Sequence, residues 1–484
     1  MRLVAAGATP SDPADLGVLD AVGLLRARSL AAAELTEACL RRIEERNGGP
    51  PSHDGSPAAI NAWTRVYPEL ARAQADAADR RLARERERAP LLCGVPIALK
   101  DLYGVAGLPL TASSRVLDGN VAERDAGVWL ALRDAGMVLI GHTHTHEFAA
   151  GGTTDQVGNP RALERIAGGS SAGSAAALAA GMTPAALGTD TCGSLRIPSA
   201  CCGTSTIKPT AGRIGLDGVL PLAPSLDHAG PMARSVADCA ALLAAMAAAG
   251  PAPVPFCPPA AALGELPVTP RAQPRPLAGL RIALTDRSAE AELAGEVAAG
   301  FDAARAACEH LGAAVVELAA PWRLCWDDLT AILLTEAWAH HARYAPRNDR
   351  YRPAIAEFVE AAATFTDAQE YLAAQERRAR GAAAWEDWFR ANDVDLVLEP
   401  TLPIVPYERG PGYDRGHAGG AGDPLIALTA LWNMTGMPVA SLPVSWSVGV
   451  SLIAPRGHEA ELTAAAIDLQ AHALGTPALT ASAS

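Results

Sequence analysis

A cysteine and a serine lie two residues apart in the stretch LGTDTCGSLRIPSACCG, residues 187–203. Either Cys192 or Ser194 could act as the nucleophile in an acyl transfer. Because the surrounding residues are small, a turn here would present successive backbone N–H groups that can bind an oxyanion. The stretch therefore predicts a nucleophile in an anion-binding turn. A tightly packed turn without chemistry is the alternative.

A lysine follows the apolar residues of VPIALKDLYGV, a segment typical of a buried strand. Burial of the Lys100 ammonium is costly, so the pKa would fall and the neutral amine could act as a base. An ion pair between Lys100 and Asp101 at the strand end is the alternative. The segment alone leaves both interpretations open.

A segment rich in glycine and serine, IAGGSSAGSAAALAAG, occupies residues 166–181. Its glycines let the backbone approach a ligand, and the helix that follows would begin with N–H groups that favour negative charge. A phosphate-binding loop or a plain turn with a helix cap is the alternative. The segment does not match G-x-x-x-x-G-K-[ST], which disfavours a nucleotide site. Its first serine, Ser170, lies 24 residues before Ser194.

Strands and helices alternate along the chain and predict an α/β fold with a mixed central sheet. Two helices are expected within residues 14–48, the second with Ser29 as its N-cap. The other expected helices are 65–89, 125–136, 174–182, about 289–311 and most of 323–390. Strands are expected in 93–101, at the start of 137–148, in 393–403 and in MPVASLPV and VGVSLIAP, with a βαβ unit formed by LAGLRIALTD, the 289–311 helix and GAAVVELA. We expect one large α/β domain with an N-terminal helical arm.

The composition argues against several classes of partner. The chain has 484 residues, with 40 Lys and Arg against 53 Asp and Glu, so its formal net charge is −13 and it would repel nucleic acid. Nine scattered cysteines without a CxxC pair favour the cytoplasm over an oxidising compartment. The N-terminus lacks the apolar run of a signal peptide, and no apolar window reaches the ~20 residues that span a bilayer. We therefore expect no nucleic acid and no membrane as a partner.

Five blocks, taken in order, closely resemble the amidase signature family. They are GVPIALKD, GGSSAGSAAALAAG, GTDTCGSLRIPSACCG, KPTAGR (208–213) and SLDHAGPMARSVADCA (225–240). Weaker similarity extends from the N-terminal helices to NMTGMPVASLPV, so it covers most of the chain. The resemblance implies the amidase signature fold for residues 66–484, with residues 1–65 as the arm and 323–390 as a helical segment that caps the active site.

The resemblance also implies a Ser–cis-Ser–Lys triad. Ser194 matches the nucleophile, Ser170 the bridging serine that follows a cis peptide bond, and Lys100 the base. The implied oxyanion hole consists of the backbone N–H groups of Thr191, Cys192, Gly193 and Ser194. Ser171 and an ion pair between Asp190 and Arg196 are expected to support the triad, with a surface location of that pair as the alternative.

This chain departs from the family pattern at three glycine positions, one of which is in GTSTIKPT, where the usual glycine before the apolar-Lys-Pro step is missing. Cys192 replaces the first glycine of the usual Gly-Gly-Ser, and Ala172 replaces a glycine of the usual Ser-Ser-Gly-Gly. Our hypothesis is that position 192 contributes only its backbone N–H, which requires a negative φ. The neighbouring pair Cys201-Cys202 is expected to be buried.

The stretch HTHTHE raises a metal-dependent amidohydrolase as an alternative of another class. Alternate residues of a strand share a face, so His142, His144 and His146 could converge on an ion. Such sites need further ligands from later strands, for which His228, His340 and His341 are the candidates. No second spaced pair supports this interpretation, and the family resemblance implies neither a metal nor a cofactor.

The sequence thus predicts a serine amidohydrolase that cleaves a carboxylic amide bond, or a related ester or carbamate, through an acyl-enzyme on Ser194. Some relatives cleave aryl amides or urethanes. The alternative within the family is the amidase subunit of a tRNA-dependent amidotransferase, which works with partner chains. The expected partner is a small-molecule substrate, and a homodimer is left open.

Overall fold

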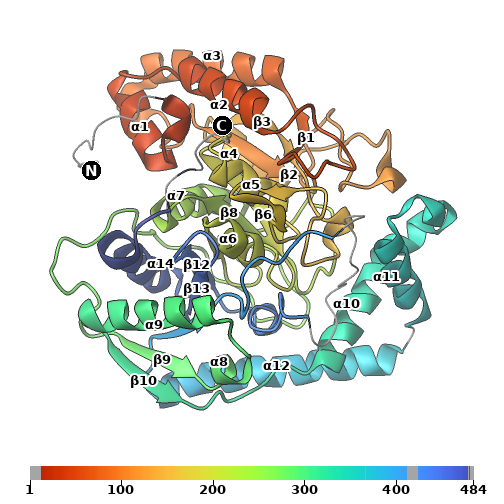
Figure 1. The fold of residues 1–484 in the computed structure, drawn as a ribbon, viewed down its shortest axis with the longest axis vertical. Helices are drawn as coiled ribbons and strands as arrows, with labels where there is room; N and C mark the ends of the chain where they lie inside the picture. The colour runs from red at the N-terminus through yellow and green to blue at the C-terminus, as the bar shows by residue number, and fades with distance from the viewer. Residues whose placement is uncertain (1–11, 366, 411–422, 478, 480–484) are drawn as a thin grey trace.

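In the residues that the computed structural model describes, 12–365, 367–410, 423–477 and 479, eleven strands form one mixed sheet through the molecule (Figure 1). The strand order is β1-β3-β2-β6-β8-β7-β12-β13-β11-β9-β10. The strands are β1 (Trp63–Val66), β2 (Pro96–Lys100), β3 (Val138–Thr143), β6 (Ala185–Asp190), β7 (Ser205–Lys208), β8 (His228–Ala233), β9 (Arg281–Thr285), β10 (Ala314–Leu318), β11 (Leu396–Pro400), β12 (Val439–Pro443) and β13 (Gly449–Ile453). A separate hairpin pairs β4 (Gly158–Asn159) with β5 (Ala162–Ile166). The expected α/β fold with a mixed sheet is confirmed.

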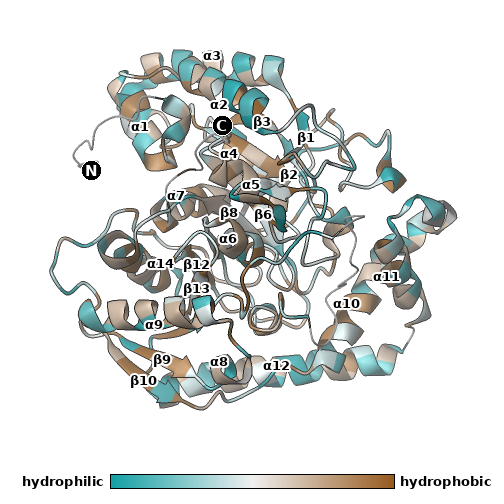
Figure 2. Ribbon diagram, in the orientation of Figure 1, coloured by the Kyte–Doolittle hydropathy of each residue, from teal (hydrophilic) through white to brown (hydrophobic). Residues whose placement is uncertain are grey.

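Helices surround the sheet and leave the central strands buried. They are α1 (Val18–Ala27), α2 (Ala32–Arg46), α3 (Pro68–Glu85), α4 (Gly127–Asp134), α5 (Ala172–Ala179), α6 (Arg196–Cys202), α7 (Val236–Met246), α8 (Arg287–Glu290), α9 (Gly295–His310), α10 (Trp326–His341), α11 (Pro353–Thr364), α12 (Ala368–Ala391), α13 (Leu431–Met434) and α14 (Glu459–Leu469). Figure 2 shows apolar residues concentrated in the central helices and strands, with polar residues along the outer helices α3 and α12. Within the described residues, none of these helices is long and apolar enough to cross a bilayer.

Two short helices in the centre carry the glycine- and serine-rich motifs. Every residue of α5 and of α6 is buried, and the two helices pack against each other and against central strands. Small side chains make this possible, because alanine and glycine let a helix approach its neighbours closely. Gly173 is such a point, since a Cβ there would collide with the backbone of Ala62 and His144. The expected burial of Cys201 and Cys202 is confirmed.

Strands β2 and β6 bring the site segments together. They are neighbours in the sheet and run parallel, with Leu99 paired to Leu187. The carboxyl ends of adjacent parallel strands meet at the same edge of a sheet. The end of β2 carries Lys100, and the end of β6 leads into the Ser194 turn.

The local predictions hold for most elements, including the parallel βαβ unit of β9, α9 and β10. One cap assignment is wrong. Ala31, not Ser29, is the N-cap of α2, and the Asp79 carboxylate of α3 accepts hydrogen bonds from the N–H groups of Ala32 and Ala33. The first N–H groups of α2 thus find their acceptor in a residue distant in sequence, whereas a local serine was expected to accept from them.

Candidate active site

Lys100 lies at the end of β2 with no exposed side-chain surface. Its Nζ atom lies 2.7 Å from Ser170 Oγ, 2.9 Å from Ser171 Oγ and 2.8 Å from Thr189 Oγ1. The Asp101 carboxylate instead accepts hydrogen bonds from Thr111 and from the Ser113 backbone. In the described part of the chain Lys100 and Asp101 form no ion pair, so that alternative is wrong.

Burial lowers the pKa of Lys100 from 10.5 to about 7, an effect only partly opposed by the carboxylates of Asp190 and Asp227. In its neutral form Nζ has two N–H donors and one lone pair for these three hydroxyls. The Ser171 hydroxyl donates to the Thr189 backbone oxygen at 3.2 Å, so it can only accept from Lys100. The amine N–H groups then donate to Ser171 and Thr189, and its lone pair is left to face the Ser170 hydroxyl. This arrangement suits Lys100 to take a proton from Ser170.

Ser170 and Ser171 lie at the start of α5, and the peptide bond between Gly169 and Ser170 is cis, as the family resemblance implied. The Ser170 backbone oxygen accepts hydrogen bonds from the His146 N–H at 3.0 Å and from the Thr154 hydroxyl at 3.1 Å. These bonds hold the backbone that aims the Ser170 side chain. The Ser170 side chain is fully buried beside Lys100.

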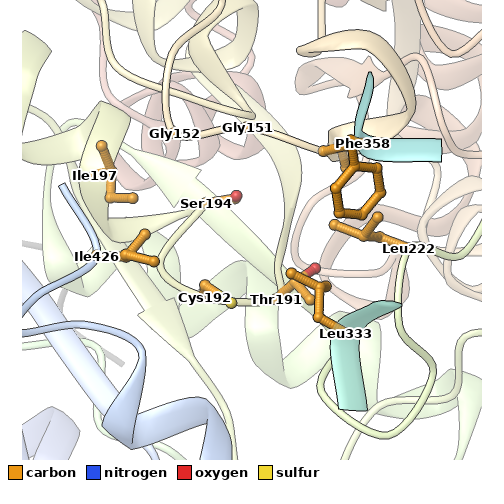
Figure 3. Close-up of a pocket in the computed structure, with 12 residues that line it drawn as sticks. Gly151, Gly152, Thr191, Cys192, Ser194, Ile197, Leu222, Leu333, Phe358 and Ile426 are labelled. Atoms are coloured by element: carbon orange, nitrogen blue, oxygen red, sulfur yellow. The ribbon is translucent and has the colours of Figure 1, made fainter. Parts of the chain in front are cut away.

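Ser194 lies in the turn between β6 and α6 and lines a cavity, shown in Figure 3. Its backbone oxygen accepts a hydrogen bond from the Ser171 N–H at 3.3 Å, which ties the turn to the start of α5. Among the described residues, no hydrogen-bond acceptor meets the backbone N–H groups of Thr191, Cys192, Gly193 and Ser194. Unpaired N–H groups beside a cavity are rare, and they suit the binding of an oxyanion.

Position 192 needs no glycine, whereas position 193 does. Cys192 is not among the residues with positive φ, so its side chain is compatible with the turn, and its backbone oxygen accepts a hydrogen bond from Thr429 Oγ1 at 2.6 Å. Gly193 has a φ of 138°, and a Cβ there would collide with Thr429. Burial raises the pKa of the Cys192 thiol, which disfavours the reactive thiolate. The geometry is consistent with our hypothesis for Cys192.

A buried ion pair fixes both ends of this turn. Arg196 donates from Nε and from Nη2 to the two carboxylate oxygens of Asp190, each at 2.9 Å, and neither side chain is exposed. Burial alone would raise the pKa of Asp190, but Arg196 lowers it to well below its usual value. Asn433 donates to the same carboxylate at 2.8 Å. The alternative of a surface pair is wrong.

The candidate histidines do not converge. In the described residues no group of three or more His, Cys, Asp or Glu is placed to hold a metal ion. The two ring nitrogens of His142 contact Tyr67 Oη at 2.9 Å and the Tyr103 backbone oxygen at 3.0 Å, and both ring nitrogens of His144 are also hydrogen-bonded. The rings thus support the end of β3 and the segment after it through hydrogen bonds. His146 lies two residues beyond His144, whereas His228 belongs to β8 and His340 and His341 end α10.

The family model for amidases matches residues 34–463 of the chain. The chain belongs to the amidase signature family. It is 36% identical over 488 aligned positions to a glutamyl-tRNA(Gln) amidotransferase subunit from Ralstonia nicotianae, an alignment that covers 90% of this chain and 94% of that protein. The fold resembles that of the peptide amidase from Stenotrophomonas maltophilia, with a TM-score of 0.80, 26% identity and coverage of 97% and 99% of the two chains. It also resembles 6-aminohexanoate cyclic dimer hydrolase, with a TM-score of 0.78, 27% identity and coverage of 94% and 97%.

Three residues around this amidase signature site were not found from the sequence. Thr189 contacts Lys100, Thr429 holds the Cys192 carbonyl, and Asn433 contacts Asp190. Thr189 lies within the stretch that contains Ser194, and its position at the end of a strand was an available signal. Thr429 and Asn433 lie more than 230 residues beyond their partners. Only the weak similarity of the NMTGMP block pointed to that region.

Asp227 is a further residue that the sequence analysis did not single out. Its carboxylate accepts hydrogen bonds from Thr191 Oγ1 at 2.6 Å and from the N–H groups of Leu222 and Ala223. Burial raises its pKa to about 7. Asp227 thus joins the turn of residues 191–194 to the segment that contains Leu222, which also lines the cavity.

Proposed function

We propose that this chain hydrolyses a carboxylic amide bond through an acyl-enzyme on Ser194. The contact that supports this function most directly is that of Lys100 Nζ with Ser170 Oγ at 2.7 Å, in a buried setting that favours the neutral amine. Ser170 passes its proton to Lys100 and takes the Ser194 proton, while Ser194 Oγ attacks the carbonyl carbon. The backbone N–H groups of residues 191–194 stabilise the oxyanion. The C–N bond then breaks, and the departing amine receives a proton back through the same relay.

Water completes the cycle by attacking the acyl-enzyme, with the relay again accepting a proton. Asp190, Arg196 and Ser171 position the turn and the lysine, and none of them needs to touch the substrate. An ester or a carbamate fits the same steps, because each also has an acyl carbonyl and a leaving group. The names of the structural relatives, peptide amidase and 6-aminohexanoate cyclic dimer hydrolase, support an enzyme that hydrolyses amides of small molecules.

Trapping of the intermediate tests this mechanism. The purified chain is mixed with an activated ester and quenched, and tandem mass spectrometry locates the acylated residue within the peptide that contains both Cys192 and Ser194. An acyl adduct at Ser194 is expected, and Ser194→Ala should form none. An adduct on Cys192 instead of Ser194 would refute the assignment of the nucleophile.

The amidase subunit of a tRNA-dependent amidotransferase is the second candidate, and the curated sequence relatives favour it. The alignment with the amidotransferase chain of R. nicotianae covers 90% of this chain. In that role the chain would work with partner chains and release ammonia from an amide donor. Robust turnover of simple amides by the purified chain alone would argue against it. Activity that appears only with partner chains and tRNA would support it over our first proposal.

We also propose that the helical segment 323–390 caps the site of a catalytic domain that follows the N-terminal arm. Leu333 of α10 and Phe358 of α11 line the cavity beside Ser194, which supports this role (Figure 3).

The nine cysteines are all free, which supports a reducing compartment such as the cytoplasm. The homodimer and the boundary at residue 65 stay predictions.

A further inference from the structure

Two cavities meet at the oxyanion turn, and they differ in which part of the catalytic machinery they touch. The first contains Ser194 in its wall, and the second does not. Ala149, Thr191 and Leu222 line both, so the cavities are adjacent. The space free of atoms in each, which includes space open to solvent, is about 380 and 590 Å³. The space around the reacting bond is thus divided into two compartments.

The first compartment suits the acyl group. Its outer wall is formed by the side chains of Ile197, Leu333, Phe358 and Ile426, as Figure 3 shows around Ser194. None of the described residues that line it carries a charged side chain. An acyl group bonded to Ser194 Oγ would start in this compartment, where most of the surface available to it is apolar.

The second compartment lies on the side of the proton relay. Thr189 is part of its wall, and Thr189 Oγ1 lies 2.8 Å from Lys100 Nζ. The leaving nitrogen must face the relay, because it receives its proton from there when the C–N bond breaks. The group attached to that nitrogen therefore extends into the second compartment.

The second compartment is also mainly apolar, with Leu216, Val219 and Leu220 in its wall. Its charged residue, Asp227, already accepts hydrogen bonds at both carboxylate oxygens from the neighbouring turn. A third cavity continues beyond it and shares Leu216 and Asp227 with it. The leaving side therefore has room for a chain of several carbons.

We infer that the preferred substrate is an N-substituted amide with an apolar group on each side of the scissile bond. This inference rests on the proposed hydrolysis at Ser194. Glutamine does not fit this arrangement. Its α-ammonium and α-carboxylate would lie on the acyl side, where no described residue of the cavity lining has a charged side chain to pair with them. Ammonia as its leaving group would leave the second compartment empty.

A series of isobutyramides with one acyl group and different amines tests the assignment of the compartments. The amines are ammonia, methylamine, n-butylamine and n-hexylamine, and kcat/KM is measured for each with the purified chain. Each methylene buried on the leaving side should raise kcat/KM roughly threefold to fourfold until the cavity is filled. Equal or falling values from ammonia to n-hexylamine would overturn the inference.

Two matched variants separate the compartments. Leu220→Trp narrows the second one and should reduce the preference for the n-hexyl amide over the primary amide at least tenfold. Leu333→Trp narrows the first and should lower kcat/KM for every amine in the same proportion, while also slowing breakdown of the acyl-enzyme. The reverse pattern would exchange the two assignments and overturn ours.

A measurement on the unaltered chain tests the inference even if the variants do not fold. Added n-hexylamine should intercept the acyl-enzyme and form the N-hexyl amide more efficiently than methylamine does, because the second compartment binds it. Equal interception of the acyl-enzyme by the two amines would count against the inference.

The variant Ser194→Ala separates this inference from the proposed function. If it is inactive and no dependence on the amine is found, only this inference fails, whereas an active Ser194→Ala refutes the proposed function itself.

Discussion

The pH of the assay changes the proposed base directly. Lys100 can accept a proton only when it is neutral, and burial lowers its pKa from 10.5 to about 7. As the pH falls below 7, the neutral fraction decreases about tenfold per pH unit. We therefore expect kcat/KM to rise with a slope of one up to about pH 7 and then level off. At pH 5 it should be about one hundredth of the plateau.

The lowered pKa has a large effect on the supply of free base. A lysine with a pKa of 10.5 would be neutral in only about 0.03% of molecules at pH 7, whereas one with a pKa of about 7 is neutral in about half of them. The buried setting thus supplies about a thousandfold more base. Removing that base in Lys100→Ala should lower kcat by roughly 10²–10⁴-fold, the usual contribution of general base catalysis.

The assay is the pH profile of kcat/KM from 5 to 9 on an uncharged amide, with far-UV circular dichroism at each pH to show that the chain stays folded. Lys208→Met is the matched control. Lys208 is also fully buried with a lowered pKa, but it donates to the Met437 backbone oxygen, away from Ser170. Its variant should keep the midpoint near 7. A flat profile from pH 5 to 8, or an unchanged kcat in Lys100→Ala, would refute the assignment of the base.

Five further outcomes test the nucleophile, the turn and the metal-dependent alternative. Ser194→Ala should lose at least about 10³-fold in kcat, whereas Cys192→Gly should keep activity, as steady-state assays of the two variants will show. Gly193→Ala forces a Cβ against Thr429 at an unfavourable φ, so kcat should fall more than tenfold, and a thermal unfolding curve will separate a displaced turn from an unfolded chain. Thr429→Val removes the hydrogen bond to the Cys192 carbonyl, worth about 1 kcal/mol, so kcat should drop about fivefold with little change in KM. Dialysis against a chelator should leave the rate unchanged, and a loss that added metal ions restore would favour the metal-dependent alternative.

Much of the site could be predicted because its motifs are local. The strand that ends at Lys100, the loop before Ser170 and the turn at Ser194 each consist of consecutive residues whose types restrict the backbone. A lysine after an apolar run predicted a buried amine without any knowledge of its partners. The direction of the Lys100 hydrogen bonds could not be predicted, because it depends on the Ser171 hydroxyl donating to the Thr189 backbone.

Contacts between segments far apart in the chain escaped the sequence analysis. Thr429 and Asn433 contact the turn from the segment before β12, and neither residue type has a pattern that indicates such a role. The prediction of Ser29 as an N-cap was wrong for the same reason. Asp79, from a different helix, accepts the hydrogen bonds of the first N–H groups instead. Hydroxyl, amide and carboxyl side chains have many possible partners, and only the packing of the whole chain selects one.

The relay and the walls of the cavities come from different parts of the fold. Lys100 and Thr189 lie at the ends of paired strands, and Ser170 lies at the start of a helix buried on every side, so the sheet fixes their positions. The walls come instead from α10, α11, the segment around residue 220 and the segment before α13, which lie outside the central strands. A substitution in a wall can therefore change which groups fit while the proton relay keeps its geometry. It follows that variants such as Leu220→Trp should alter the choice of substrate and still show the midpoint near pH 7 that Lys100 sets.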